Sequence, residues 1–343
     1  MAADAVSAST NTNISSTTRD FALGSVVDEV FLGMPLLAKL YLREQMAWKG
    51  GTNITRPIKI ANMDSVAQDY SPGEALTSGR VATLTKPWFT WGYTQVPSTY
   101  TLEEYLQNGG DDMKVVDFAG YLTENIQLAL KIKLYKSFYH VTSTPDTDKG
   151  LGSMVAALDH DVTYAHVSRA TTVTNMEWQG ASLGETFADQ NTARTIGVSL
   201  FRQALDICGR HVKDAGDYLF IVGPSLYQSL QSQVDGSNII TNPGELVQYG
   251  FRSFTLDGIE VVNDPYLTAA ALSDETTPEK WAFLLNVSDW ELRLHPQRSF
   301  EWKDYTWQGD RDMGVDEWLA RVMVAGKLCC WKPNGSIWLQ NVT

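Results

Sequence analysis

The most reactive side chains of the sequence lie in the segment LDHD, residues 158–161, and in His166 just beyond it. His160, Asp161 and His166 are residue types that bind metal ions or transfer protons, so one hypothesis is a metal centre or an acid–base pair. The spacing matches no metal-ligand signature, and the five histidines of the chain are spread along it. We therefore predict solvated or structural roles here, and no catalytic residue, metal or cofactor.

A glycan-cleaving cleft is a second hypothesis, because the chain has 11 tryptophans and many carboxylates. No pair of carboxylates can be assigned to one site, and most tryptophans lie in strand-like segments where core or interface packing is expected. The glycines of GLGSMV, residues 150–155, lack the rest of a dinucleotide fingerprint, and the sequence has no nucleophile elbow or zinc-protease helix. The sequence therefore favours a protein that is not an enzyme.

Composition narrows the remaining classes of protein. The 343 residues, 43% of them hydrophobic, suffice for one large or two ordinary domains. The 27 Lys and Arg against 40 Asp and Glu give a formal net charge of −13, which argues against binding dominated by phosphate neutralisation. Cys208, Cys329 and Cys330 have no disulfide or metal spacing, which is typical of a reducing compartment. No signal peptide is evident, and charged residues interrupt the apolar stretches, so no membrane partner is expected.

A long helix is predicted in mid-chain. Asp111 and Asp112 suit its start, because the free amides there favour negative charge, and it would run to Tyr139. Apolar residues recur on one face at three- and four-residue steps: Val115, Phe118, Ala119, Leu122, Ile126, Leu130, Leu134 and Phe138. At about 1.5 Å per residue the helix would be roughly 40 Å long, the length of a spine rather than a connector.

Shorter elements flank this helix. Before it, the pattern from Phe21 to Trp48 is helical in two short pieces, one of them opened by Pro35. After it, a mixed region has an amphipathic helix around 192–212 and a buried strand, DYLFIVG. Residues 281–343 are dominated by strands, and Asn334-Gly335 predicts a two-residue hairpin between the last two of them.

The polar stretch DYSPGEALTSGR, residues 69–80, separates two strand-like segments. Hairpin connections in compact domains are usually about two to five residues, so a polar tip of this length must project from any core. Phe89, Trp91 and Tyr93 alternate along the return strand and predict one aromatic face that a partner would cover. The predicted inter-subunit contact residues are Tyr70, Glu74, Arg80, Phe89, Trp91 and Tyr93.

In its order of elements the chain resembles the tailed-bacteriophage major capsid proteins of the Hong Kong 97-like fold. The elements are WKGGTNITRPIKI leading into the hairpin, the long helix, a mixed region with DYLFIVGPSLYQSL and LDGIEVVNDP, and a strand-rich return. The resemblance covers nearly the whole chain and rests on no single short motif. It implies an α+β fold with an N-terminal arm (1–48), an extended loop (49–100), a peripheral domain with the spine helix (101–149 and 286–343) and an axial domain (150–285).

The resemblance implies a role in assembly. Such a protein self-assembles, in the host bacterial cytoplasm, into hexamers and pentamers of an icosahedral virion shell, which encloses double-stranded DNA without sequence specificity. Implied partners are identical copies, a separate scaffolding protein, a portal at one vertex and, in some shells, a decoration protein. In the family the extended loop lies across a neighbouring subunit, which gives the polar tip its partner. Lys131, Lys133 and Lys136 of the spine helix would be local basic groups facing the lumen, although a solvated helix face also accounts for them.

Two further expectations concern maturation. The helical pattern begins near Phe21, which leaves too little chain for a long scaffolding region, so an uncleaved subunit is expected. Some relatives cross-link a loop lysine to a neighbour's asparagine, but no lysine lies between Lys59 and Lys86, so a non-covalent shell is expected. Another virion protein, from the tail or the shell surface, is the alternative. The long helix argues against it, because such proteins read as strands throughout.

Overall fold

The computed structural model describes residues 34–43, 46–48, 51–59, 66–75, 79, 83–104, 112–142, 145–146, 149–159, 163–169, 178–181, 193–209, 217–236, 244–273, 275–307 and 317–343. Its helices are α2 (Pro35–Leu42), α4 (Asp112–Tyr139), α5 (Met154–Leu158), α6 (Val198–Gly209) and α7 (Pro224–Gly236), with 3₁₀ turns η5 (Glu245–Tyr249), η6 (Pro278–Lys280), η7 (Val287–Asp289) and η8 (Pro333–Gly335). Its strands are β1 (Met46–Trp48), β2 (Ile54–Thr55), β3 (Ile58–Lys59), β4 (Leu84–Thr85), β5 (Trp88–Phe89), β6 (Gly92–Thr101), β7 (Tyr218–Val222), β8 (Ser253–Leu256), β9 (Ile259–Asn263), β10 (Ala282–Asn286), β11 (Trp290–Leu294), β12 (Glu301–Trp307), β13 (Glu317–Cys330) and β14 (Ile337–Leu339).

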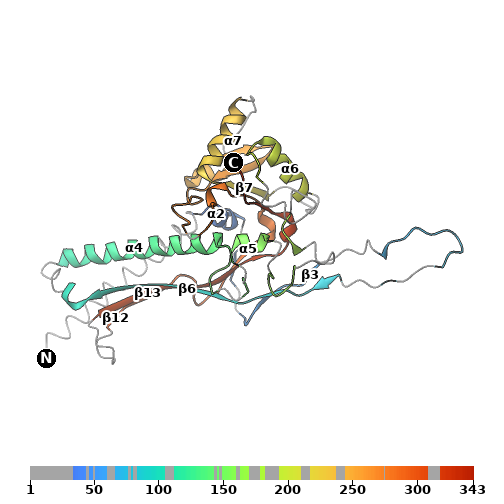
Figure 1. The fold of residues 1–343 in the computed structure, drawn as a ribbon. Helices are drawn as coiled ribbons and strands as arrows, with labels where there is room; N and C mark the ends of the chain where they lie inside the picture. Colours follow the sequence, from blue (N-terminus) through green and yellow to red (C-terminus); the bar gives the residue numbers. More distant parts are fainter. Residues whose placement is uncertain are drawn as a thin grey trace.

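These elements form an elongated layer and a more compact part that stands on it (Figure 1). In the layer, α4 runs alongside β6, β13 and β12. The compact part contains β7 with α6 and α7, and it lies over the C-terminal half of α4. A narrow ribbon leads from the layer to a loop that lies beyond the rest of the molecule. The expected mixture of helix and sheet is therefore confirmed.

The long helix predicted in mid-chain is confirmed as α4, whose 28 residues end at Tyr139. Its predicted apolar face is buried where side chains are described, since Ile126, Leu130, Leu134 and Phe138 are at most 3% exposed. Val115, Phe118 and Ala119 lie outside the described side chains, and Leu122 is partly buried. None of the described helices combines the length and hydropathy that a membrane span needs.

Strand β13 organises the first sheet, in which β1, β11, β13 and β12 follow one another and β6 also pairs with β13. β6 pairs with the N-terminal part of β13, from Gly92–Gly326 to Thr101–Glu317. β11 pairs with the C-terminal end of β13, from Leu294–Gly326 to Trp290–Cys330. β1 pairs in parallel with β11. The helical interpretation of residues 46–48 is therefore wrong, because pairing with a sheet edge overrides a weak local propensity.

The second sheet has the order β14-β10-β7-β9-β8 and is covered on both faces. Every residue of β7 is buried, as the DYLFIVG pattern predicted. Phe220 and Val222 pack in one cluster with α6 and α7, whereas Leu219 and Ile221 pack in a second cluster with α2 and α4. A strand presents alternate residues to opposite faces, so β7 connects both clusters.

The hairpin predicted at Asn334-Gly335 is wrong. These residues form the 3₁₀ turn η8, and the following strand β14 pairs with β10 of the second sheet instead of returning along β13. The reason is that the end of β13 is already occupied, since β11 pairs with residues 326–330 and the N–H of Leu328 donates to the Leu151 carbonyl at 2.7 Å. The side chains of Ile337 and Leu339 instead bury against the second sheet. Strand β14 thus lies with the mixed region, although the division of the chain into domains stays a prediction.

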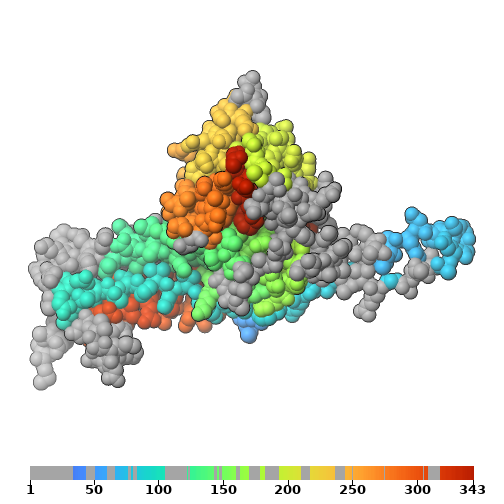
Figure 2. Space-filling view, in the orientation of Figure 1, coloured from blue at the N-terminus to red at the C-terminus, as the bar shows by residue number. Residues whose placement is uncertain are grey.

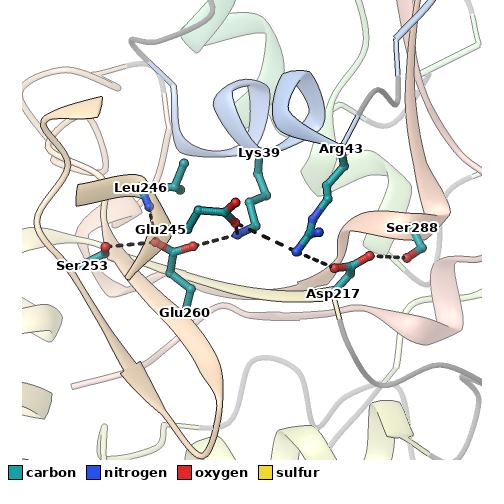
Figure 3. A network of polar contacts seen from close by, with 8 residues as sticks. All are labelled: Lys39, Arg43, Asp217, Glu245, Leu246, Ser253, Glu260 and Ser288. Carbon is teal, nitrogen blue, oxygen red and sulfur yellow. Dashed lines mark hydrogen bonds and ion pairs between the residues drawn. The ribbon is translucent and has the colours of Figure 1, made fainter. Parts of the chain in front are cut away.

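A buried ion pair fastens α2 to the second sheet (Figure 3). Lys39 is 4% exposed, and its Nζ lies 2.8 Å from Glu260 Oε2 and 2.6 Å from Glu245 Oε2. The other oxygen of Glu260 accepts hydrogen bonds from the backbone N–H of Leu246, at 2.6 Å, and from the hydroxyl of Ser253, at 3.0 Å. One turn further along α2, Arg43 pairs with Asp217 at 2.9 Å in a more exposed position. The Lys39–Glu260 pair is buried on both sides, so little water screens its charges.

The C-terminal end of α4 is bonded to the second sheet through Asp264. The Tyr139 hydroxyl donates to its Oδ2 at 2.6 Å, and the backbone N–H of Tyr266 donates to its Oδ1 at 2.9 Å. Burial raises the pKa of Asp264 from 3.8 to about 6, although the hydrogen bonds act in the opposite direction. A fully buried carboxyl therefore lies at the junction between the layer and the compact part.

Replacing Lys39 with Met should lower the free energy of unfolding by about 3 kcal/mol, because it leaves the Glu260 carboxylate buried without its cation. Arg43→Met is the matched control on the same helix. Arg43 and Asp217 are 41% and 32% exposed, so its loss should cost less than about 1 kcal/mol. Urea unfolding followed by circular dichroism measures both, and equal losses would contradict the difference in burial.

Stability should fall as pH rises from about 4 to about 6, because Asp264 binds a proton in the folded state over this range and has lost it in the unfolded state. At about 1.4 kcal/mol per pKa unit the change is at most roughly 3 kcal/mol. Asp264→Asn should remove this part of the pH dependence in urea unfolding measured at several pH values. Burial also raises the pKa of Asp289 to about 6, so part of the pH dependence of stability should remain in this variant. An unchanged slope in Asp264→Asn would refute the assignment.

Candidate assembly surface

The polar stretch predicted to project does so at the end of a two-stranded ribbon. β2 pairs with β5, and β3 pairs with β4. Each of these paired segments has two residues on each strand, and the loop follows the second one. Residues 66–75 lie at the far end, away from every other described element (Figures 1 and 2). Within the described part of the loop, residues 67–75 are exposed and none belongs to the core.

The tip of the loop, residues 66–75, holds its own turn. The backbone N–H of Ser71 donates to Glu74 Oε2 at 2.9 Å, and the N–H of Glu74 donates to the Ser71 carbonyl at 3.0 Å. Gly73 has φ +90°, a conformation that other residues rarely adopt, and no atom lies within 4 Å of a Cβ built there. Tyr70 is 66% exposed. Of the predicted tip contacts, Tyr70 and Glu74 are thus exposed and Arg80 lies outside the described residues.

His166 has a structural role at the base of the ribbon. Its ring stacks on Trp88 with centroids 3.4 Å apart, and its backbone N–H donates to Asp146 Oδ2 at 2.8 Å. Ala165 and His166 both have positive φ, so this tight turn is strained and held by its surroundings. His160 and Asp161 lie outside the described residues, and within these no group of three or more His, Cys, Asp or Glu could hold a metal ion.

The expected aromatic face of Phe89, Trp91 and Tyr93 is not present. Phe89 is 2% exposed and lies in the subunit's own core, with ring centroids 5.2 Å from Tyr164 and 5.4 Å from Trp331. Trp91 is partly buried and donates its Nε1–H to the Gly51 carbonyl at 2.7 Å, whereas Tyr93 is 60% exposed. The prediction assumed one continuous strand, but β5 ends at Phe89 and β6 begins at Gly92, so the alternation is broken.

A groove between β6 and the C-terminal half of α4 was not predicted from the sequence. Its volume is about 460 Å³, and among its described lining residues the charged or titratable side chains are Lys133, Lys136, His140, Lys149 and Glu275. Exposed Tyr93 lies in the same lining, and its backbone N–H donates to the Lys149 carbonyl at 2.9 Å. Lys149 lies beyond the end of α4 and is not part of the helical pattern. Only the tertiary structure therefore brings it beside Lys133 and Lys136.

Close backbone approach creates this groove. A Cβ at Gly92 would lie 2.0 Å from the Gly150 carbonyl oxygen, so only glycine lets the start of β6 meet residue 150. On the opposite wall, His140 Nδ1 lies 2.7 Å from Glu275 Oε1, which also accepts the N–H of Val141 at 3.1 Å. Glu275 of the lining is thus engaged by His140 and by the backbone of residue 141.

The three cysteines are poorly suited to nucleophilic catalysis. Burial raises the pKa of the Cys208 thiol to about 12 and raises the pKa values of Cys329 and Cys330 as well. A thiol attacks as the thiolate, so these side chains remain inert at neutral pH. The arrangement instead offers contact surfaces: an exposed loop tip at one end and a basic groove in the body.

No protein-family model and no curated protein sequence matches the chain. Several solved structures are similar to the chain. The capsid asymmetric unit of cyanophage A-1(L) matches it with a TM-score of 0.60 at 14% identity, and the match covers 87% of this chain and 90% of that chain. The capsid of the native GTA particle has a TM-score of 0.52 at 10% identity, covering 89% and 91%. At such identities the similarity concerns the fold. The chain therefore has the fold of tailed-phage capsid subunits, as the order of its elements predicted.

Proposed function

We propose that this protein is a major capsid protein, which assembles into hexamers and pentamers of an icosahedral phage head that encloses double-stranded DNA. The observation that carries the proposal is the exposed loop at the end of a two-stranded ribbon, on a chain with a capsid-subunit fold. Residues 67–75 of this loop are exposed and stabilise no core, so their partner surface lies on another molecule.

The remaining parts take roles that follow from this assignment. The long layer of α4 and the first sheet serves as the rigid peripheral body, and the second sheet with α6 and α7 serves as the axial part. Head-to-tail contacts between identical copies close into rings, and rings of six and five build the shell. Partners outside the subunit are a separate scaffolding protein, a portal at one vertex and, in some shells, a decoration protein. Net acidity suits the container, since weak attachment lets packaged DNA move.

Joining Met63 to Val81 through a Gly-containing turn should abolish assembly but leave the subunit folded. The deleted segment offers its own core almost nothing, so melting followed by circular dichroism should shift little. Sedimentation should then show free subunits only. Leu130→Ala is the opposite control, since it removes a fully buried side chain and should cost about 2 to 5 kcal/mol without touching the loop. Normal shells from the shortened protein would remove the main support for the proposal.

Assembled particles should give a monomer band near 38.1 kDa on denaturing gels. The reason is that no lysine lies between Lys59 and Lys86, so the loop has no amine with which to form an isopeptide bond. Boiling in reducing detergent is the appropriate treatment, because it removes non-covalent contacts and disulfides alike. Ladders of linked oligomers after this treatment would refute a non-covalent shell.

A further inference from the structure

The ribbon that holds the loop has a break at its base. β6 is fixed along its length by β13, but β5 ends at Phe89 and β6 begins at Gly92. Beyond the break, the β2–β5 and β3–β4 pairs belong to neither of the two large sheets. Isolated two-stranded pairs are marginally stable at best, and these have two residues on each strand. The pairing with β13 therefore sets the direction in which the ribbon leaves the body, and beyond the break its orientation needs a second attachment.

The turn of residues 164–167 has the conformation of a constrained attachment point. Tyr164 and Val167 exchange both backbone hydrogen bonds, at 3.2 and 3.1 Å. The central residues Ala165 and His166 have φ of +53° and +59°, values that a two-residue turn usually assigns to Asn and Gly. Ala165 is fully buried, and Asp146 accepts the N–H of His166. Surrounding contacts thus hold two residues in a disfavoured conformation, which is typical of sites under functional constraint.

This turn contacts both residues of β5. The backbone N–H of Trp88 donates to the Ala165 carbonyl at 3.2 Å, and the rings of Trp88 and His166 stack with an interplanar angle of 8°. The next residue, Phe89, has its ring edge-on to that of Tyr164, with centroids 5.2 Å apart. Consecutive residues of a strand point to opposite faces, so the turn holds β5 from two sides.

We propose that the turn 164–167 fixes the orientation of the ribbon, and that His166 is the positioning residue within it. A single hydrogen bond lets a strand rotate about it, whereas a parallel stack of two rings also opposes tilting. A ribbon held in one orientation before assembly lowers the entropy cost of each contact that its loop makes. The inference rests on the proposed function, because it explains how an exposed loop is presented at a constant angle to another molecule.

Packing, rather than an ion pair, is the role of the His166 ring. Its Nδ1 lies 3.9 Å from Asp146 Oδ2, too far for a hydrogen bond, and this oxygen already accepts the backbone N–H of His166. The centroids of the His166 and Trp88 rings are 3.4 Å apart, at van der Waals contact. Replacing the ring while keeping the backbone conformation therefore separates the stack from the turn.

Spin labels on the free subunit measure the orientation of the ribbon directly. Leu84→Cys places one label on β4, where the native side chain is 71% exposed, and Ala129→Cys places the other at an exposed position of α4. The three native cysteines are buried, so the labels react with the introduced thiols. Double electron–electron resonance then gives the distribution of distances between ribbon and body. The unchanged turn should give one narrow distribution.

His166→Asn removes the ring and retains the turn, since Asn tolerates positive φ better than most residues. The population of displaced ribbon should rise about two- to tenfold, the range that one aromatic pair contributes. Trp88→Leu should have a similar effect, and the two changes together should add little to either alone, because both remove the same stack. His140→Asn is the matched control, since His140 contacts Glu275 and lies outside the turn. It should leave the distribution unchanged.

Assembly should depend on the stack as well. In His166→Asn, the fraction of protein that sediments as rings or shells should fall at least about threefold, because every subunit of a ring needs an oriented ribbon. Urea unfolding followed by circular dichroism shows whether the variant is folded and how stable it is. A merely structural ring predicts a lower unfolding midpoint with an unchanged distance distribution, and this result would overturn the inference.

The results separate this inference from the proposed function. The distances are measured on free subunits, so they do not depend on whether shells form. If the unchanged protein forms no ring or shell, the capsid assignment fails, while the distances still decide the role of His166. If shells form normally from folded His166→Asn, or if its distribution stays narrow, the positioning role is wrong. If Trp88→Leu does not fold, the comparison of His166→Asn with His140→Asn decides.

Discussion

The fold depends on one strand, β13, and on its simultaneous pairing with β6, β11 and β12. Its partners come from residues 92–101, 290–294 and 301–307, so the pairing joins distant parts of the chain. β6 is also the continuation of the ribbon that holds the exposed loop, and its full-length pairing with β13 fixes the direction in which the ribbon leaves the body. At its other end, β13 leads through η8 to β14, so the same strand connects the two sheets.

Charged groups at the joints between elements are buried and bonded, although Arg169 Nε has no hydrogen-bond partner. Lys39 is held by two carboxylates under α2, and Asp264 accepts from Tyr139 at the end of α4. Arg169, 1% exposed, donates to the carbonyls of Ala156 and Ala157 at the end of α5 at 3.0 and 2.7 Å. Burial lowers the pKa of Arg169 to about 10. Such groups add little net stability, but removing one partner is costly, so they fix how the elements are placed.

A rigid body with an exposed appendage agrees with a function in assembly. Both faces of the second sheet are covered and α4 is anchored at its C-terminal end, so this part of the subunit is packed by its own chain. The loop tip is the opposite, because its residues form their own turn and bury nothing. A protein of this kind uses its core to set geometry and its exposed ends to set contacts. The similarity in fold to capsid subunits at 14% identity or less is compatible with such a division.

The sequence alone determined the features that depend on local periodicity and polarity. The three- and four-residue spacing of Ile126, Leu130 and Leu134 predicted α4, the apolar run at 218–222 predicted β7, and the polarity of residues 69–80 predicted an exposed loop. A helix satisfies its own backbone and needs only neighbouring residues, so its pattern is visible along the chain. The order of these elements was also enough to predict the capsid-subunit fold.

Only the tertiary structure decided which distant segments meet. The Asn-Gly pair predicted a return along β13, but β11 already pairs with the end of that strand, and β14 joins β10 instead. Phe89 reads as part of an exposed stripe, yet the break after β5 places it against Tyr164 and Trp331. Lys149 joins the lysines of α4 only because Gly92 lets β6 approach residue 150. Strand pairing and burial depend on contacts between residues far apart in sequence, and local pattern carries no record of them.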